Sequence, residues 1–167
     1  IVSVDGHAQM PPEAWPKYLE KRYHDHLPAL VKENASYTRI SGHFLQRLHN
    51  SDLYDIYDTD HALRNGGIMG VWDCKMRIQE MDREGIAGEF VYSGDPRASG
   101  LFYQSSNWST TRELCQAGVK AYNRWLQGFC ADAPSRVFGL GQTALRSPAE
   151  GVRDLRKIKE MGFVGVM

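Results

Sequence analysis

The sequence predicts an α/β protein built on a parallel sheet. Short apolar runs that suit buried strands alternate at least three times with helical patterns, and glycine-containing connections join them. The first of these runs ends in an acidic residue and a histidine, one residue apart. The arrangement that fits best is a (β/α)8 TIM barrel. Such a barrel typically needs about 250 residues, so the 167 residues here are expected to cover about its first half.

A doubly wound parallel sheet is the alternative, because it shows the same alternation of strands and helices. When such a sheet binds a dinucleotide, a Gly-x-Gly-x-x-Gly sequence follows its first strand. Residues 5–9 read Asp-Gly-His-Ala-Gln and lack that sequence. A barrel places its active groups at the carboxyl ends of strands, and Asp5 and His7 stand at such an end. The sequence therefore favours the barrel.

The opening strand is expected to have a polar and an apolar face, since side chains two apart on a strand point the same way. The polar set is Ser3, Asp5, His7 and Gln9. The apolar set, expected to be buried, is Val2, Val4 and Ala8. An Asp-x-His pair on one face can supply two ligands to one metal ion. The alternative for this pair is a hydrogen bond between its two side chains that merely completes the strand.

Helix and strand signals follow in alternation. The expected elements are a helix from Pro11 that carries Tyr23, a helix at 73–84, a strand at 86–92, a helix that starts in a capping box at 110–113, a strand at 137–142, a helix that Ser147 and Pro148 begin, and a strand at 163–167. Asp73 is the expected N-cap of the second helix. The last helix carries an apolar stripe, expected to be buried, of Val152, Leu155, Ile158 and Met161.

The periodicity fades between about residues 34 and 71, where glycines and polar residues are scattered. We expect a long insertion there, with residues 1–167 forming the N-terminal part of a single barrel domain. Loops of this length often shape a binding site. The insertion contains His43, His49 and His61, which lack the spacing of metal ligands. His24-Asp25-His26 looks like a metal motif. It ends a charged helical pattern, where histidines suit the helix dipole, and we interpret it as structural.

Composition excludes two classes of partner. Twenty basic and twenty acidic side chains cancel, so the sequence has no basic footprint for nucleic acid and no net charge to attach it to a membrane. No apolar run approaches the roughly 18 residues of a membrane span. Widely spaced Cys74, Cys115 and Cys130 predict free thiols, a reducing compartment and a cytoplasmic location. Because the sequence opens on Ile1 and closes at Met167 inside an expected strand, we expect a longer polypeptide.

Several segments together resemble one family. Val-Asp-Gly-His at 4–7, followed by Pro-Pro-Glu-Ala-Trp at 11–15, resembles the opening of the metal-dependent amidohydrolase-related (amidohydrolase 2) family of barrel enzymes. That family includes the aminocarboxymuconate-semialdehyde and resorcylate decarboxylases. Further segments resemble its later helices and strands, and these are 77–86, 122–126, 134–140 and 161–166. The resemblance covers most of the chain except 34–71.

The resemblance implies a divalent metal ion bound at the first strand, by His-x-His or, in the decarboxylases, by Glu-x-His. In one register, Asp5 and His7 replace the Glu-x-His pair and are both ligands. In the other, His7 is the first histidine and Gln9 stands where the second would be. Glutamine is a poor zinc ligand, so we prefer the first register. Zinc is favoured over manganese or iron. A further histidine and aspartate, and the catalytic residue, are expected beyond Met167.

The function implied is that of a metal-dependent hydrolase or non-oxidative decarboxylase acting on a small carboxylated or carbonyl substrate. Gln9, Tyr92 and Gln142 lie near expected strand ends and are candidate substrate-binding residues, or else packing at the barrel mouth. One alternative is an oxygenase with two iron or manganese ions on the same fold. Another is a non-catalytic barrel subunit of a hetero-oligomer. The expected partners are a small-molecule substrate and either a second copy of the chain or the remainder of the same barrel.

Overall fold

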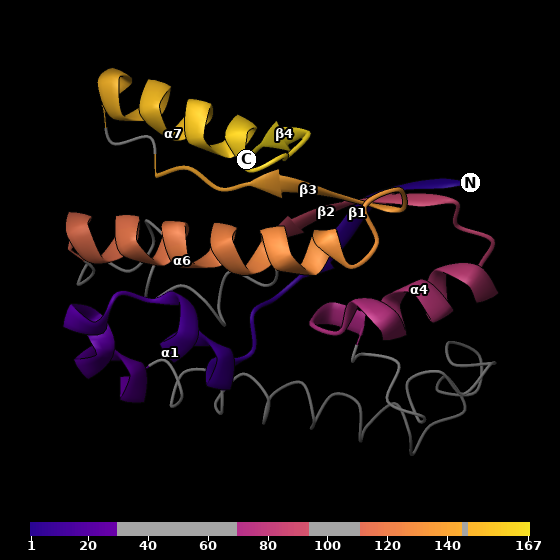
Figure 1. Cartoon of the computed structure of the whole chain (residues 1–167), viewed down its shortest axis with the longest axis horizontal. Coiled ribbons are helices and arrows are strands. Elements are labelled where there is room, and N and C mark those ends of the chain that lie inside the picture. The colour runs from indigo at the N-terminus through magenta and orange to yellow at the C-terminus, as the bar shows by residue number, and fades with distance from the viewer. Residues whose placement is uncertain (30–69, 94–110, 145–146) are drawn as a thin grey trace, which may run out of the picture.

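The described part of the chain forms a parallel sheet with helices packed beside it (Figure 1). The computed structural model describes residues 1–29, 70–93, 111–144 and 147–167. The strands are β1 (Val2–Ala8), β2 (Gly88–Ser93), β3 (Val137–Gly141) and β4 (Gly165–Val166). All neighbours are parallel, and the spatial order β1-β2-β3-β4 repeats the order along the chain. A doubly wound sheet reverses its strand order at a switch point, so the uninterrupted order fits an arc of a barrel.

Three predicted helices are present. They are α4 (Cys74–Arg83), α6 (Arg112–Ala131) and α7 (Pro148–Glu160). Asp73 and Ser147 cap α4 and α7 as expected, each accepting a hydrogen bond from a backbone N–H of the first turn. The predicted capping box at 110–113 is wrong, because Thr111 caps α6 by accepting from the Leu114 N–H. Glu113 is therefore the second helical residue, one place short of the position that reaches back.

The helix expected from Pro11 is broken into three short pieces. These are η1 (Pro12–Ala14), α1 (Trp15–Tyr18) and η2 (Lys21–His26), where η denotes a 3₁₀ helix. The break falls at Leu19 and Glu20, whose ψ angles of 140° and 136° are extended. Leu19 and Trp15 are nevertheless buried, and Tyr23 packs against the core. Burial of these apolar side chains is thus achieved without a continuous helix.

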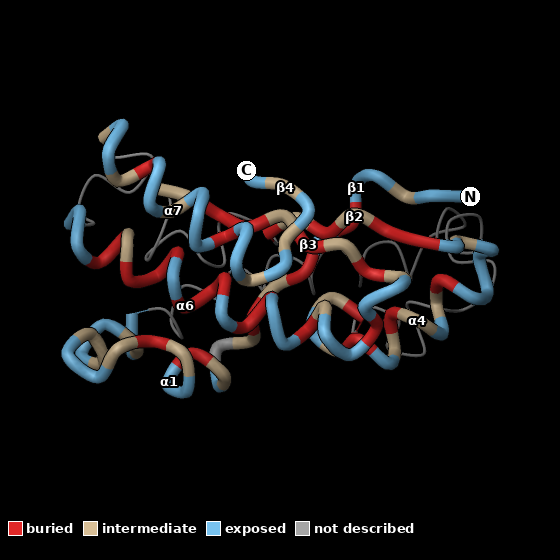
Figure 2. The backbone as a smooth tube through the Cα atoms, turned by 45° about the horizontal axis from the view of Figure 1, so that its top comes forward, coloured by how far each residue is buried: buried red, intermediate tan, exposed pale blue. Residues whose placement is uncertain are grey.

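Two apolar faces that were predicted to be buried are exposed over part of their length (Figure 2). Val2 and Val4 of β1 are 56% and 64% exposed, because β2 is the one strand that pairs with β1 within the described ranges. On α7, only Ile158 of the predicted stripe is buried, while Val152 and Leu155 are exposed. The prediction of burial is therefore wrong for these four residues, and it is confirmed for Ala8 and Ile158. A barrel would extend the sheet beyond β1 and β4 and add neighbours at these edges.

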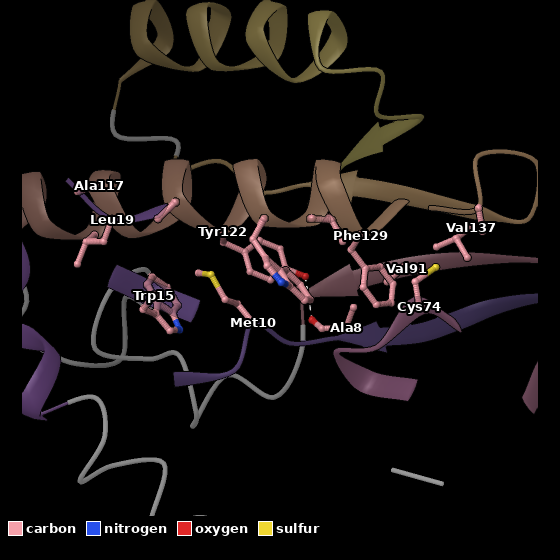
Figure 3. Close-up of a cluster of buried hydrophobic side chains, with 14 of the residues drawn as sticks. Ala8, Met10, Trp15, Leu19, Cys74, Val91, Ala117, Tyr122, Phe129 and Val137 are labelled. Carbon is pink, nitrogen blue, oxygen red and sulfur yellow. Dashed lines mark hydrogen bonds between the residues drawn. The ribbon is translucent and has the colours of Figure 1, made fainter. Parts of the chain in front are cut away.

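The main core lies on the face of the sheet that α6 covers (Figure 3). The largest fully buried side chains are Trp15, Tyr122, Met10, Leu126 and Val91. An aromatic stripe of α6 packs in this core, with ring centroids of Tyr122 and Trp125 5.6 Å apart and those of Trp125 and Phe129 5.3 Å apart. Within the ranges given above, no helix is long and apolar enough to cross a lipid bilayer.

Candidate metal centre

Asp5 and His7 project from the same face of β1, near its carboxyl end. Asp5 Oδ1 lies 3.5 Å from His7 Nε2, and the side chains are 88% and 54% exposed, respectively. An N–H···O hydrogen bond normally spans about 2.7–3.2 Å, so this separation is too long for a strong one. The sheet therefore brings the two groups together without binding them tightly to each other.

The separation suits two ligands of one cation. A tetrahedral zinc ion with bonds of about 2.0–2.2 Å holds two ligand atoms roughly 3.3–3.5 Å apart. A carboxylate oxygen and an imidazole nitrogen are also a donor set that zinc, manganese and iron accept. Among the described residues, no group of three or more His, Cys, Asp or Glu gathers at one point. Asp5 and His7 thus fit as two ligands of a set that needs more.

The hydrogen on Nδ1 of His7 is placed by a neighbour on β2. His7 Nδ1 lies 2.9 Å from the main-chain carbonyl oxygen of Ser93. A carbonyl oxygen only accepts, so Nδ1 carries the hydrogen and donates it. In the neutral ring, the lone pair is then on Nε2, the nitrogen that faces Asp5. Metal-binding histidines show this pattern, in which the second nitrogen donates to a carbonyl or carboxylate.

Ser3 does not share the face of β1 that carries Asp5 and His7, and its predicted placement there is wrong. The register of β1 against β2 shifts between Ser3 and Gly6, which places one extra residue in β1. Ser3 Oγ consequently donates to Glu89 Oε1 at 3.2 Å, on the side of the sheet opposite Asp5 and His7. A β-bulge of this kind has no signature in the alternation of polar and apolar residues.

The three candidate substrate residues have different surroundings. Tyr92 is half-buried and pairs in register with His7, with ring centroids 6.0 Å apart. Gln9 is half-buried, and its backbone N–H donates to the Val71 carbonyl. Gln142 is buried, and its Nε2 donates to Ser93 Oγ at 2.8 Å. Tyr92 is thus the one of the three seen in contact with a proposed ligand, and substrate binding by the set stays a prediction.

A buried ion pair beneath the Asp5–His7 pair was missed by the sequence reasoning. Arg77 Nη1 of α4 donates to Glu89 Oε2 of β2, and Arg77 Nη2 donates to the main-chain carbonyl of His7. Arg77 Nε also donates to the Gly70 carbonyl at 2.7 Å. The arginine therefore ties α4 to the strand that carries the ligands. A signal was available, because Arg77 falls on the buried stripe of α4 with Cys74 and Met81.

Gly6 is required between the two ligands for a steric reason. A Cβ built on Gly6 would lie 2.4 Å from the Glu89 Cδ, inside any real contact distance. The carboxylate of Glu89 is held in place by Arg77 and Ser3, so it cannot move aside freely. The Asp-Gly-His sequence is therefore dictated partly by the ion pair below it.

The other candidate ligands are in different situations. His24 Nε2 lies 3.1 Å from the Leu19 carbonyl oxygen, which agrees with a structural role. The insertion at about 34–71, with His43, His49 and His61, lies outside the described residues except for its last positions, 70 and 71. All three cysteines are free thiols, as predicted. Burial raises the pKa of Cys74 to about 11 and that of Cys130 to about 12, so both are protonated at neutral pH.

Several solved structures resemble the chain in fold. No protein-family model matches the chain. The 2,6-dihydroxybenzoate decarboxylase from Rhizobium superposes with a TM-score of 0.50 at 20% identity, over 99% of this chain and 36% of its own. A structure of 2,6-dihydroxybenzoate decarboxylase complexed with 2,6-dihydroxybenzoate superposes with a TM-score of 0.50 at 20% identity, over 99% of this chain and 37% of its own. A dihydroxybenzoic acid decarboxylase from Polaromonas sp. JS666, with bound manganese and 2-nitroresorcinol, gives 0.47 and 17%, over 99% and 36%.

These similarities concern the fold. The described strands and helices have the backbone arrangement of part of the barrel in the two structures that superpose with a TM-score of 0.50, and the predicted fold class is confirmed. The resemblance to the amidohydrolase-related barrel enzymes is supported at the same level. The chain spans about 36% of the length of the Rhizobium enzyme. Activity, metal and substrate therefore belong to the proposal that follows.

Proposed function

We propose that the chain carries the first-strand metal ligands of a metal-dependent, non-oxidative decarboxylase. The observation that carries the proposal is the geometry of Asp5 and His7, with Nδ1 of the imidazole donating to the Ser93 carbonyl and Nε2 facing the carboxylate at 3.5 Å. The pair stands at the carboxyl end of β1, where barrel enzymes place their active groups. A bound divalent cation would polarise a substrate oxygen or hold a substrate carboxylate. Zinc is the first choice, with manganese and iron as alternatives.

A small hydroxylated aromatic carboxylate is the proposed substrate class. Tyr92 and Phe90 alternate with the buried residues of β2, which puts their rings on the face that carries His7. Phe138 of β3 extends this surface, with its ring centroid 5.7 Å from that of Phe90. Half-buried rings of this kind suit a planar aromatic ligand. The two superposed enzymes with TM-scores of 0.50 also have names that specify a dihydroxybenzoate.

The reaction breaks the bond between the ring carbon and the carboxyl carbon. Carbon dioxide leaves, the electron pair stays on the ring carbon, and a proton replaces the lost group. Within the described residues we assign Asp5 and His7 to metal binding and Tyr92 to contact with the ring. The proton donor and the remaining metal ligands are proposed to lie beyond Met167, as the family resemblance implies.

The test uses the purified full-length protein. Metal content per chain is measured by inductively coupled plasma mass spectrometry, and carbon dioxide release from 2,6-dihydroxybenzoate is followed by chromatography of the product. Asp5→Asn and His7→Gln are expected to remove most of the metal and the activity. Asp25→Asn and His26→Gln make the same chemical changes at exposed positions of η2 and are expected to preserve both.

Two results would overturn the proposal. One is stoichiometric metal in the Asp5 and His7 variants, and the other is full turnover by metal-free protein. Oxygen consumption coupled to turnover, with two metal ions per chain, would instead favour the oxygenase. A wild-type protein that holds no metal and copurifies with an active homologue would favour the non-catalytic subunit.

A further inference from the structure

We propose that Gln142 is a positioning residue for His7 and acts through Ser93. This role presupposes the proposed metal site, and it replaces direct contact of Gln142 with substrate. The residues belong to the ends of three successive strands and to α6, and hydrogen bonds connect them in one chain from Asn123 to His7. In each of these hydrogen bonds the donor and the acceptor can be told apart from the chemistry of the two groups.

The first step fixes the backbone of Gln142. The Asn123 side chain on α6 accepts from the Gln142 N–H at 2.8 Å and donates to the Gln142 carbonyl at 2.9 Å. Both residues are buried. Because one amide satisfies both backbone groups, the residue that follows β3 has its peptide planes held by the helix that covers the sheet.

The second step carries this constraint from β3 to β2. Gln142 Nε2 donates to Ser93 Oγ at 2.8 Å, and both residues are buried over more than nine-tenths of their surface. A buried amide that lost this acceptor would be left unsatisfied, which costs about 1–3 kcal/mol. Gln142 therefore binds the hydroxyl of Ser93, the last residue of β2. The main-chain carbonyl of Ser93 is the group that accepts from His7.

The third step sets the state of His7. The Ser93 carbonyl oxygen accepts from His7 Nδ1 at 2.9 Å. In the other neutral tautomer, a nitrogen lone pair would face this oxygen, and the contact would be repulsive. If the carbonyl moved, the ring would be free to rotate or to take that tautomer. Nε2 would then carry the hydrogen and could not bind a cation.

The experiment measures the tautomer of His7 in the full-length, chelator-stripped protein. Long-range ¹H–¹⁵N spectra are recorded near pH 8.5, about two units above the ordinary imidazole pKa of about 6.5. The wild type is expected to show His7 as the Nδ1–H form. Gln142→Met removes the donor to Ser93 and is expected to give a mixture of both forms. Zinc affinity, measured separately by competition with a chelator dye, is expected to fall about 10- to 100-fold.

A matched control is Gln127→Met. Gln127 lies on α6, and its exposed side chain donates to the Met161 carbonyl at 3.1 Å, so the same substitution removes one amide bond elsewhere. The control is expected to keep both the tautomer and the affinity of the wild type. Ser93→Ala, which removes a single oxygen and keeps the carbonyl, serves as the second variant if Gln142→Met fails to fold. It is expected to shift the tautomer in the same direction.

The outcomes separate this role from the metal site itself. An unchanged Nδ1–H form of His7 in the folded Gln142 or Ser93 variant would overturn the positioning role, as would an equal shift in Gln127→Met. A wild type that binds no zinc, but whose His7 tautomer depends on Gln142, would overturn the proposed metal function and leave the positioning role standing. A tautomer shift with weakened zinc binding supports both.

Discussion

Arg77 Nη1 lies 2.5 Å from Glu89 Oε2, and about nine-tenths of each side chain is buried. The pair joins α4 to β2, and the second guanidinium nitrogen extends the link to the carbonyl of His7 on β1. Desolvation of two charges is costly and is offset only when further hydrogen bonds satisfy the groups. Here the additional partners are the Gly70 and His7 carbonyls and the Ser3 hydroxyl.

Arg77→Met is expected to lower the free energy of unfolding of the full-length protein by about 3–5 kcal/mol, because Glu89 would be left charged and buried. Urea unfolding followed by circular dichroism measures the loss. Arg136→Met is the matched control, since Arg136 pairs with Asp82 at 2.8 Å near the surface and with the Ile86 carbonyl. Its expected cost is about 1 kcal/mol. Equal losses in the two variants would contradict a dominant role for the buried pair.

Gly6→Ala is expected to destabilise the protein by about 1–3 kcal/mol through overpacking against the Glu89 carboxylate. A Cβ at this position would lie 2.4 Å from Glu89 Cδ. Gly128→Ala on α6 is the control, because the nearest atom that a Cβ there would meet among the described residues is the Tyr18 hydroxyl, at 4.0 Å. Alanine favours a helix over glycine by up to about 1 kcal/mol, so the control is expected to be neutral or stabilising. A neutral Gly6→Ala would show that Glu89 moves aside.

Tyr122→Phe is expected to cost about 1–3 kcal/mol, because it removes the hydroxyl whose single hydrogen is shared between two main-chain carbonyls at the ends of β1 and β2. It lies 2.9 Å from the Ala8 oxygen and 3.2 Å from the Tyr92 oxygen. Thermal or urea unfolding checks this value. Tyr23→Phe, at a half-buried position of η2, is expected to stay within about 0.5 kcal/mol of the wild type. If the free energies of unfolding of the two variants differed by less than about 0.5 kcal/mol, the stabilising role of the Tyr122 hydroxyl would be refuted.

Stability is expected to fall as the pH rises from about 9 toward 12. Burial raises the pKa of Cys130 to about 12 and that of Cys74 to about 11, above the value of about 8.5 for a thiol in an unfolded chain. In this range the unfolded state binds fewer protons than the folded state, so the free energy of unfolding decreases with pH. Each thiol contributes a slope of at most about 1.4 kcal/mol per pH unit.

Urea unfolding of the wild type and of Cys130→Ala between about pH 8 and pH 10.5 isolates this contribution from tyrosine and lysine titration. The free energy of unfolding of the variant is expected to decline less steeply with pH, whatever its absolute stability. Parallel profiles for the two proteins would show that Cys130 does not titrate differently in the folded state.

Much of the architecture is readable from local patterns. The alternation of apolar runs with helical periodicity predicts β1 to β4 and their parallel pairing. The caps Asp73 and Ser147 are recognisable because the side chain and the N–H that it binds lie two or three residues apart. The aromatic stripe of α6 is likewise a property of one segment. The shared face of Asp5 and His7 follows from their spacing within a single strand.

Other features depend on partners that are distant in sequence. The Ser3 hydroxyl donates to the Glu89 carboxylate, and His7 donates to the Ser93 carbonyl. In each of these hydrogen bonds the two residues are 86 positions apart in the sequence. A main-chain carbonyl such as that of Ser93 has no residue identity, so no motif could reveal its role. Exposure of Val2 and Val4 likewise depends on which strands pair with β1. The alternation of valines in the sequence is the same whether or not another strand lies beside them.

The succession of strands and helices along the chain and the shared face of one acid and one imidazole therefore follow from residues close together in the chain, where periodicity and capping act. The tautomer of His7, the requirement for Gly6 and the buried Arg77–Glu89 pair arise only when α4, α6 and three strands are packed together. The physical reason is that hydrogen bonds and steric contacts depend on distance in space, and folding sets that distance independently of separation along the chain.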